Sequence, residues 1–405
     1  MKKLIRLLAV IALMTSVSCS GDKDAVYNKS VLIYVAGNNS LSSYVSSTIS
    51  QLSKGDYLPP TGSKDEVLLL YIRDLFDNPY LMRMSRDEDG TVRKTTVFHY
   101  PSDQNSATPE TLEQVLRDAE NLYPSRERGL ILWSHSSGWL PTRYMNDYME
   151  IEENAAGYVD GKMTIKGGKV TSFGQDYVNT KLEIEIQDLA EVLPFHYDYI
   201  IFDSCLMGCV EVAYELKDKC DFIAFSPAEI KSQGFPYYMM MEPLFKDNDI
   251  VRALTDICAE YYEYYRKDYE RDPWGSGGTI SLVSTAALDH LAAEFSGIVA
   301  RHRDDIYNLK EEDVQGYFRY GRHWFFDLDH IVENVTESTE LSRFRAALDK
   351  AVIYKAATAG FMLNKGGFYI YHYSGLSSFI PMYDEQFLNN YYSKLKWNRA
   401  TSLVR

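Results

Sequence analysis

The stretch Tyr199-Ile-Ile-Phe-Asp-Ser-Cys-Leu-Met-Gly-Cys-Val-Glu-Val-Ala-Tyr-Glu-Leu216 passes from a short apolar run into a segment with helical spacing. Its opening residues, 199–202, are hydrophobic throughout, which is typical of a strand buried on both faces of a sheet. After it, apolar side chains recur at intervals of three and four, and these are Cys209, Val212, Ala213 and Leu216. The stretch therefore predicts a buried strand followed by a helix.

The same alternation extends outward in both directions along the chain. Buried strands are predicted at Val31–Ala36, Val67–Ile72, Leu130–Trp133, Tyr199–Phe202, Phe222–Phe225 and Ile280–Val283. Helical spacing recurs at Leu112, Val115, Leu116, Ala119 and Leu122, and at Ile186, Leu189, Ala190 and Leu193. Strands that alternate with helices predict an α/β fold with a mostly parallel sheet flanked by helices.

Two regions interrupt this alternation. Residues 144–180 show little periodicity and are expected to form a long loop or small β excursion inserted into an α/β domain of residues 30–285. After about residue 286 the sequence turns helical, at Leu288–Val299 and Leu341–Ile353, before the strand-like run Gly367–Tyr373. We expect a C-terminal subdomain of mixed, mainly helical structure at 286–405.

The composition excludes several classes of protein. Of the 405 residues 45% are hydrophobic, which is ample for a packed core. A net charge of −15 without a Lys/Arg-rich block argues against nucleic-acid partners, because such binding depends on neutralising phosphates. Five cysteines are too few for a disulfide scaffold, and the histidine spacings contain no zinc motif.

The N-terminus is typical of a bacterial secretory signal. Residues 1–18 place three positive side chains before an apolar run and small residues, and no later segment is long enough to span a bilayer. The residues before Cys19 resemble a lipobox, which would make Cys19 the lipidated first residue; ordinary signal cleavage at the same point is the alternative. Residues 19–29 would form a tether, and the mature net charge would be −18, since residues 1–18 carry three positive charges and no negative ones. We expect an exported protein, held to the membrane only by a lipid anchor and displayed at the outer surface.

Two predicted strands end beside reactive side chains. His135 follows the strand in Leu130-Ile-Leu-Trp-Ser-His-Ser-Ser-Gly-Trp139, and Cys205 follows the strand of the opening stretch. Reactive groups in a parallel sheet collect at the carboxyl ends of the strands. A cysteine at the start of a helix would have its thiolate favoured by the helix dipole, and a nearby histidine could exchange a proton with it. Such a pair is the minimal apparatus for nucleophilic acyl transfer.

Together these motifs resemble the clostripain family of cysteine endopeptidases, which shares a caspase-like fold with caspases, legumain and gingipains. The resemblance also covers Val31-Leu-Ile-Tyr-Val-Ala-Gly-Asn-Asn39, Ser172-Phe-Gly174 and Ser374-Gly-Leu-Ser377, and it runs from about residue 30 to 385. It implies a Cys–His dyad with Cys205 as the nucleophile and His135 as the general acid and base. No third catalytic residue is obligatory.

The resemblance also implies an oxyanion hole made by the main-chain N–H groups of Cys205 and Ser136. Here the sequence departs from the family, which usually has glycine after the histidine. If that position required a positive φ or a close approach to substrate, the side chain of Ser136 would cost roughly 1 to 2 kcal/mol or misplace the donor. A second interpretation follows, in which the dyad is impaired and the protein is a surface lipoprotein that binds protein or glycan ligands.

Substrate preference depends on Asp203. In the family this position helps to line an acidic pocket for Arg or Lys, because a buried cation needs a paired carboxylate. The alternative is that Asp203 or Ser204 caps the following helix. Glu229 and Gln233 are candidates for further pocket residues, but neither matches the family pattern unambiguously.

Family members often cleave themselves at a basic residue between the histidine and the cysteine. Lys162, Lys166 and Lys169 lie there beside glycines and are the candidate processing sites. Some relatives use calcium, but no EF-hand-like loop gives it a location, so no cofactor is predicted. Cys209 is expected to be a core residue, although a disulfide with Cys205 would be possible, as would one between Cys220 and Cys258. The expected partner is a peptide or protein substrate, and the oligomeric state is not predicted.

Overall fold

The computed structural model describes residues 26–142, 144–145, 172–180, 182–319 and 324–405. Its centre is a sheet of nine strands in the order β10-β8-β7-β6-β5-β1-β2-β3-β4. The strands are β1 Tyr27–Ala36, β2 Glu66–Arg73, β3 Tyr80–Arg86, β4 Val92–His99, β5 Ser125–Trp133, β6 Tyr197–Asp203, β7 Cys220–Phe225, β8 Thr279–Ser284 and β10 Val352–Ala357. Two small sheets pair β11 Gly360–Phe361 with β12 Phe368–Tyr369, and β13 Ser377–Ser378 with β9 Phe326–Asp327.

The middle of the sheet is parallel and its borders are antiparallel. Strands β7, β6, β5, β1 and β2 pair in parallel, whereas β8 and β10 on one side and β3 and β4 on the other run antiparallel to their neighbours. The predicted mostly parallel sheet flanked by helices is confirmed, and all six predicted strands are present. The hairpin of β3 and β4 was not predicted, because β4 is mostly exposed and lacks a buried run.

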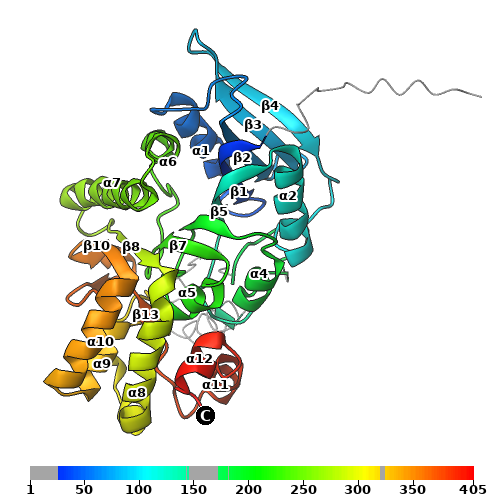
Figure 1. The fold of residues 1–405 in the computed structure, drawn as a ribbon. Coiled ribbons are helices and arrows are strands. Elements are labelled where there is room, and N and C mark those ends of the chain that lie inside the picture. The colour runs from blue at the N-terminus through cyan, green and yellow to red at the C-terminus, as the bar shows by residue number, and fades with distance from the viewer. Residues whose placement is uncertain (1–25, 143, 146–171, 181, 320–323) are drawn as a thin grey trace, which may run out of the picture.

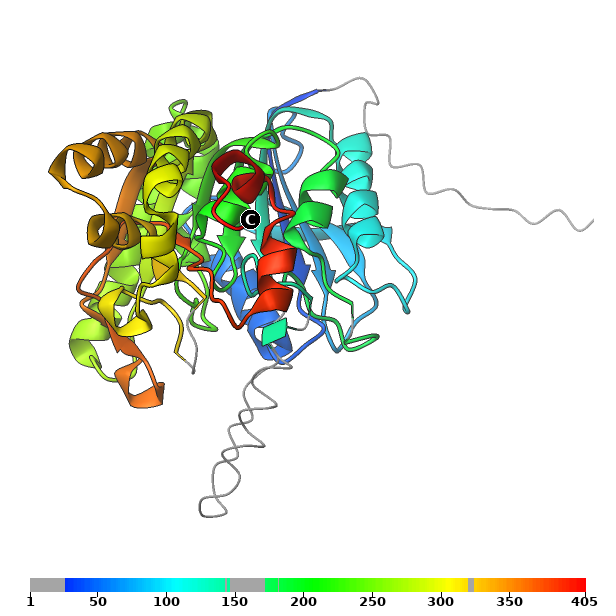
Figure 2. The same ribbon diagram turned by 90° about the horizontal axis from the view of Figure 1, so that it is seen from below.

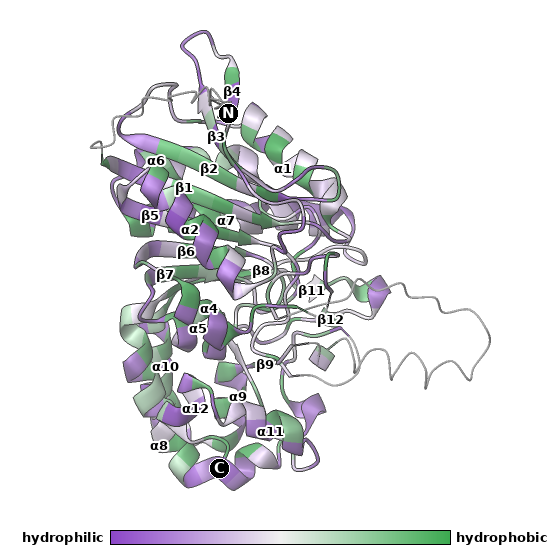
Figure 3. Ribbon diagram, turned by 90° about the vertical axis from the view of Figure 1, so that its right-hand side faces the viewer, coloured by the Kyte–Doolittle hydropathy of each residue, from purple (hydrophilic) through white to green (hydrophobic). Residues whose placement is uncertain are grey.

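Helices cover both faces of the sheet (Figure 1). They are α1 Ser42–Lys54, α2 Pro109–Leu122, α4 Ile186–Val192, α5 Val210–Leu216, α6 Met241–Lys246, α7 Ile250–Arg271, α8 Leu288–Tyr307, α9 Leu328–Val335, α10 Ser338–Ala351, α11 Gln386–Tyr392 and α12 Lys396–Thr401. Along β1, Val31, Ile33 and Val35 join one hydrophobic cluster, whereas Leu32 and Tyr34 join the other. The first cluster contains residues of α1, α6 and α7, and the second contains residues of α2, α4, α5 and α8. Figure 3 shows the resulting apolar colour of β1 and β2 beneath helices with polar outer faces.

The region after residue 286 shares this core. Strand β10 extends the main sheet by pairing with β8, and α12 packs against both α5 and α8. In Figure 2 the red C-terminal helices lie against the green part of the chain. The predicted boundary at 286 therefore does not separate two hydrophobic cores.

Two finer expectations need correction, and several predicted residues are not described. Strand β1 begins at Tyr27, so residues 27–29 of the predicted tether pair with neighbouring strands. Only Phe368–Tyr369 of the predicted strand Gly367–Tyr373 is extended and paired. Residues 1–18 and Cys19, and the candidate processing sites Lys162, Lys166 and Lys169, lie outside the described residues.

Candidate active site

His135 and Cys205 lie at the same edge of the sheet. Strands β5 and β6 are parallel neighbours, and their last residues, Trp133 and Asp203, are paired in register. His135 and Cys205 each follow two positions later, so the sheet itself places both beyond adjacent carboxyl ends. The predicted juxtaposition of these two strand ends is therefore present.

The turn that carries Cys205 differs from the prediction. Helix α5 begins at Val210, so Cys205 does not start a helix, and the dipole argument for its thiolate was wrong. The chain instead continues beside the segment after β7: the N–H of Leu206 donates to Ala228 O at 3.0 Å. Leu206 has a φ of 63°, which shows how sharply the chain turns after the cysteine.

The thiol of Cys205 faces main-chain groups of Ile230. The N–H of Ile230 donates to Sγ at 3.4 Å, and Sγ lies 3.7 Å from Ile230 O, to which it can donate. Burial, followed by the charge of Glu229, raises the pKa of the Cys205 thiol to about 12. In this conformation Cys205 is therefore a neutral thiol held by the 228–230 segment.

The ring of His135 is held from the other side. Its Nε2 lies 2.8 Å from Oγ of Ser40, in the loop after β1. Burial lowers the pKa of His135 to about 4, so the ring is neutral at neutral pH. Within the described residues no hydrogen bond joins His135 to Cys205.

Ser136 is fully buried, and its backbone does not have a positive φ. The left-handed strain considered for this position is therefore absent. Its Oγ donates to the main-chain O of Cys205 at 2.5 Å, linking the histidine turn to the cysteine turn. Gly138, two residues later, has a φ of 62°, and a Cβ added there would lie 2.5 Å from Leu206 O, so it is this position of the turn that needs glycine.

The two N–H groups expected to form the oxyanion hole are available. Among the described residues, neither the main-chain N–H of Ser136 nor that of Cys205 donates to a protein acceptor. Ser137 and Gly174 bridge the histidine turn to residues 172–174, through Ser137 N to Ser172 O and Gly174 N to His135 O. The unbonded N–H of Ser136, between these two bridges, and that of Cys205, on the other turn, are suitable donors to a developing oxyanion.

Asp203 is buried beneath the segment that follows β7. Its Oδ2 accepts from the Tyr237 hydroxyl at 2.9 Å and from the N–H of Phe235 at 3.3 Å, and Gly234 packs directly against the carboxylate. Burial raises the pKa of Asp203 to about 7. The capping alternative was wrong for both Asp203 and Ser204, because α5 starts at Val210 without a side-chain cap.

The two further pocket candidates have different surroundings. Glu229 forms an ion pair with Arg319 through two hydrogen bonds, one of 2.8 Å, so its charge is already neutralised. Gln233 is exposed. Asp203, in contrast, has no basic side chain as a partner in the part of the chain that the structure describes.

Sequence reasoning missed the loop after β1 and its contacts with residues 172–177. The N–H of Tyr177 donates to Asn38 O at 2.8 Å, and buried Asp176 accepts from the side chain of Asn38 at 2.5 Å and from Ser106 at 2.8 Å. One indication of this region was present in the sequence: the motifs at 31–39 and 172–174 both resemble the clostripain family. That resemblance did not indicate that the two segments are in contact. These bonds fix the wall of the site around His135.

The four described cysteines are free thiols. The possible disulfides Cys205–Cys209 and Cys220–Cys258 are therefore absent from the structure. Cys209 is buried, as expected, but it immediately precedes α5.

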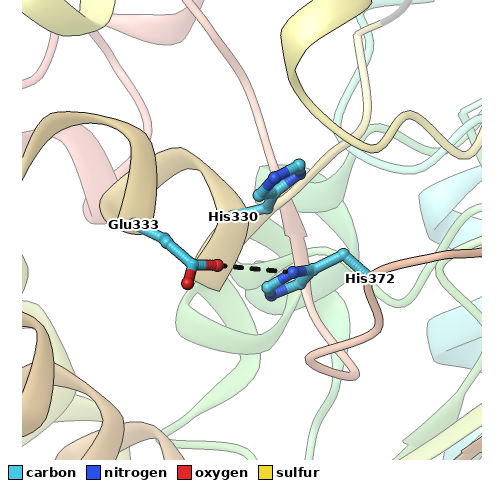
Figure 4. Close-up of side chains that lie close together, drawn as sticks. All are labelled: His330, Glu333 and His372. Carbon is cyan, nitrogen blue, oxygen red and sulfur yellow. Dashed lines mark ion pairs between the residues drawn. The ribbon is translucent and has the colours of Figure 1, made fainter.

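Among the described residues, one group of side chains is close enough together to be considered as a metal site: His330, Glu333 and His372 (Figure 4). The two rings are stacked, with centroids 4.5 Å apart and planes inclined by 9°, so their in-plane lone pairs cannot converge on one ion. In addition, His330 Nδ1 accepts from the N–H of Gln315 at 2.9 Å, which leaves the proton on Nε2 of the neutral ring. The hydrogen bond to Asp329 raises the pKa of His372. The surroundings of His372 therefore favour its protonated, cationic form over the neutral form that a metal ligand needs.

Comparisons with known proteins agree with this geometry. The sequence model of the clostripain family, peptidase family C11, matches residues 33–401. An inactive zymogen C11 protease from Parabacteroides distasonis is 31% identical and superposes with a TM-score of 0.76, over 93% of this chain and 98% of that one. A secreted C11 cysteine protease from Bacteroides thetaiotaomicron, solved with an irreversible peptide inhibitor, is 26% identical with a TM-score of 0.74, over 92% of this chain and 98% of that one.

Two further searches gave no match: one among curated protein sequences and one for membrane-spanning helices in the part of the chain that the structure describes. No curated protein sequence matches the chain. Among the described residues, no helix has both the length and the apolar character needed to cross a bilayer.

Proposed function

The chain belongs to the clostripain family of cysteine proteases, and from this premise we propose that it hydrolyses peptide bonds after Arg or Lys, with Cys205 as the nucleophile and His135 as the general acid and base. The observation that carries the proposal is the register of β5 and β6, which sets these two side chains beyond adjacent strand ends. A substrate peptide laid across this edge would contact both.

The reaction would proceed in two stages. The proton of the Cys205 thiol passes to His135 as sulfur attacks the scissile carbonyl carbon, and the oxyanion collapses as His135 returns the proton to the leaving amine. A water molecule, deprotonated by His135, then attacks the thioester carbonyl carbon; the C–S bond breaks, the acid product leaves, and His135 returns the proton to the sulfur of Cys205. The free N–H groups of Ser136 and Cys205 support an oxyanion hole in both stages.

The contact between the Cys205 thiol and Ile230 must break before the sulfur can attack a substrate. Sγ of Cys205 is bonded to Ile230 and its pKa lies near 12, so attack begins by breaking that contact and moving the proton. The resemblance to a zymogen of the family supports a resting state of this kind. The proposed self-cleavage at Lys162, Lys166 or Lys169 would be the corresponding activating event.

Specificity for basic residues rests on the charge of Asp203. Both of its hydrogen bonds go to Oδ2, so Oδ1 remains to accept from an incoming guanidinium or ammonium group. A buried acid without a cationic partner gains most when a cation reaches it. The relative that was solved with a peptide inhibitor supports peptides as the substrate class.

The proposed location is outside the cytoplasm. The signal-like residues 1–18 and the lipobox-like Cys19 support export followed by lipid attachment, and a related protease from Bacteroides thetaiotaomicron is secreted. The mass of the mature N-terminal residue distinguishes a lipidated Cys19 from ordinary cleavage.

One assay tests the enzyme against the alternative of a binding module. Purified mature protein and its Cys205→Ala variant are compared on fluorogenic peptides that end in Arg, Lys or a neutral residue. We expect cleavage of the basic peptides by the wild type and a loss of at least about 10³-fold in the variant. Activity that persisted in Cys205→Ala would exclude Cys205 as the nucleophile, and inactivity of a processed wild type on every peptide would favour the binding module.

A further inference from the structure

The side chain of Ser40 contacts the ring of His135 directly. Its Oγ lies 2.8 Å from Nε2, and among the described residues this hydroxyl is the only hydrogen-bond partner of the ring. Ser40 itself is exposed at the edge of the site, in the loop between β1 and α1. The contact therefore does not follow from packing of the core.

The loop that carries Ser40 is held rigidly by its neighbour. Asn39 is fully buried, and its side-chain amide donates to Ala36 O at 2.9 Å and to Gln175 O at 2.8 Å. Its Oδ1 accepts from the N–H of Leu41 at 2.8 Å, and its main-chain O accepts from the N–H of Ser42 at 3.1 Å, so the peptide groups on both sides of Ser40 are fixed. A hydroxyl presented by such a loop is preorganised for one partner.

The contact distinguishes the two nitrogens of the ring. With Nε2 occupied by Ser40, Nδ1 has no protein partner in the described part of the chain. If Ser40 accepts the Nε2 proton, the neutral ring has its lone pair on Nδ1, and the imidazolium can form without losing its bond at Nε2. We propose that Ser40 is a positioning residue that holds Nε2–H of His135, an inference that rests on the proposed function. Nδ1 is then the nitrogen that exchanges protons with Cys205 and with the leaving amine.

The proton balance follows from this assignment. Nδ1 takes the thiol proton of Cys205 when the S–C bond forms, and His135 then carries protons on both nitrogens while Nε2–H donates to Ser40. Nδ1 gives the proton to the amine when the C–N bond breaks. Ser40 neither gains nor loses a proton, so its hydroxyl assists both stages in the same way.

Histidine NMR tests the contact without requiring activity. In the Cys205→Ala protein, the ¹⁵N shifts of His135, assigned with His135→Gln, should show the Nε2–H tautomer. Adding Ser40→Ala should populate both tautomers, and adding Ser40→Asp should raise the pKa of His135 by about one unit or more, because a carboxylate stabilises the imidazolium. Ser47→Ala and Ser47→Asp, at an exposed position of α1, are the matched controls and should leave both quantities nearly unchanged.

Kinetics test the consequence for catalysis. Ser40→Ala should lower kcat by roughly tenfold with little change in KM, as expected for the loss of one hydrogen bond to a charged group, and Ser40→Thr should restore most of it. An Nδ1–H tautomer in the Cys205→Ala protein, or His135 shifts identical with and without the Ser40 hydroxyl, would overturn the proposal. So would an unchanged kcat in Ser40→Ala of an active enzyme. If the wild type cleaves no peptide, the proposed function fails, and the NMR result alone decides whether Ser40 positions the ring.

Discussion

Ser136 connects the two turns of the candidate site through its own hydroxyl. Its bond to the O of Cys205 holds the peptide that leads into Leu206, whose φ of 63° costs roughly 1 to 2 kcal/mol in a non-glycine residue. Glycine at position 136 would leave that carbonyl without this donor. The contact therefore argues that the serine hydroxyl supports the cysteine turn.

Asp203→Asn tests specificity at the scale of one side chain. Asparagine keeps the shape of the residue but removes the charge, so kcat/KM for peptides with Arg or Lys should fall by about 30-fold or more, while neutral peptides change little. Asp218→Asn, at an exposed position in the turn after α5, controls for the loss of a charge elsewhere. Equal losses on basic and neutral peptides would instead assign Asp203 to holding Phe235 and Tyr237.

The same residue predicts a dependence on pH. The pKa of Asp203 is raised to about 7, so in the free protein the carboxyl loses its negative charge as the pH falls through that value. A bound cation would favour the charged form and lower the pKa. The KM for basic peptides should therefore rise below about pH 7, and this rise should be absent in Asp203→Asn.

At the scale of elements, buried strands were the most predictable feature. Strands such as β1 and β6 have residues facing both hydrophobic clusters, so their sequences are apolar without interruption. This pattern placed the ends of β5 and β6, and with them His135 and Cys205. Strand β4 has an exposed side and no such run, so it left no signal.

The turns beyond the strands were less predictable. The segment 206–209 follows directly on the strand, but main-chain bonds of Leu206 and Gly208 to Ala228 and Ser226, together with the left-handed φ of Leu206, keep it non-helical until α5 begins at Val210. The contact between Ser40 and His135 joins positions that are far apart in the chain, and no local pattern encodes it. Hydrogen bonds between segments distant in the sequence determine both the path of residues 206–209 and the contact of Ser40 with His135.

Gly138→Ala tests the tight crossing of the histidine and cysteine turns. Gly138 has a positive φ and no room for a Cβ, which would lie 2.5 Å from Leu206 O and 2.7 Å from the Phe325 ring. Gly62 also has a positive φ, of 80°, but its Cβ would meet no atom within 4 Å, so Gly62→Ala isolates the cost of conformation. We expect about 1 kcal/mol for Gly62→Ala and at least about 2 kcal/mol more for Gly138→Ala in denaturant unfolding. Equal losses would show that the crossing can relax.

At the scale of the whole molecule, one sheet draws its strands from both sides of residues 146–171, from Tyr27 to Ala357. Strands β1 to β5 precede the candidate processing sites, and β6, β7, β8 and β10 follow them, yet β5 and β6 pair in register over residues 129–133 and 199–203. His135 and Cys205 thus belong to different sides of the proposed cut. The site exists only while the two sides share the sheet.

This continuity predicts the behaviour of the cleaved protein. Cutting between residues 146 and 171 removes one covalent link, whereas separating the fragments would expose the paired edges of β5 and β6 and the cores on both faces. Wild type that has cleaved itself should therefore show two bands on a denaturing gel, but a single species in gel filtration under native conditions. Cys205→Ala should remain one band.

A matched control separates association from self-cleavage. In Cys205→Ala, a recognition site for an added specific protease is placed beside Lys166, so the cut is made without the protein's own activity. The fragments should still co-elute, and they should separate only at a urea concentration that unfolds the sheet, since each fragment alone lacks part of both cores. If the two fragments eluted separately in native buffer, the shared sheet would not be what holds them together. A wild-type chain that stays intact would contradict only the proposed self-cleavage.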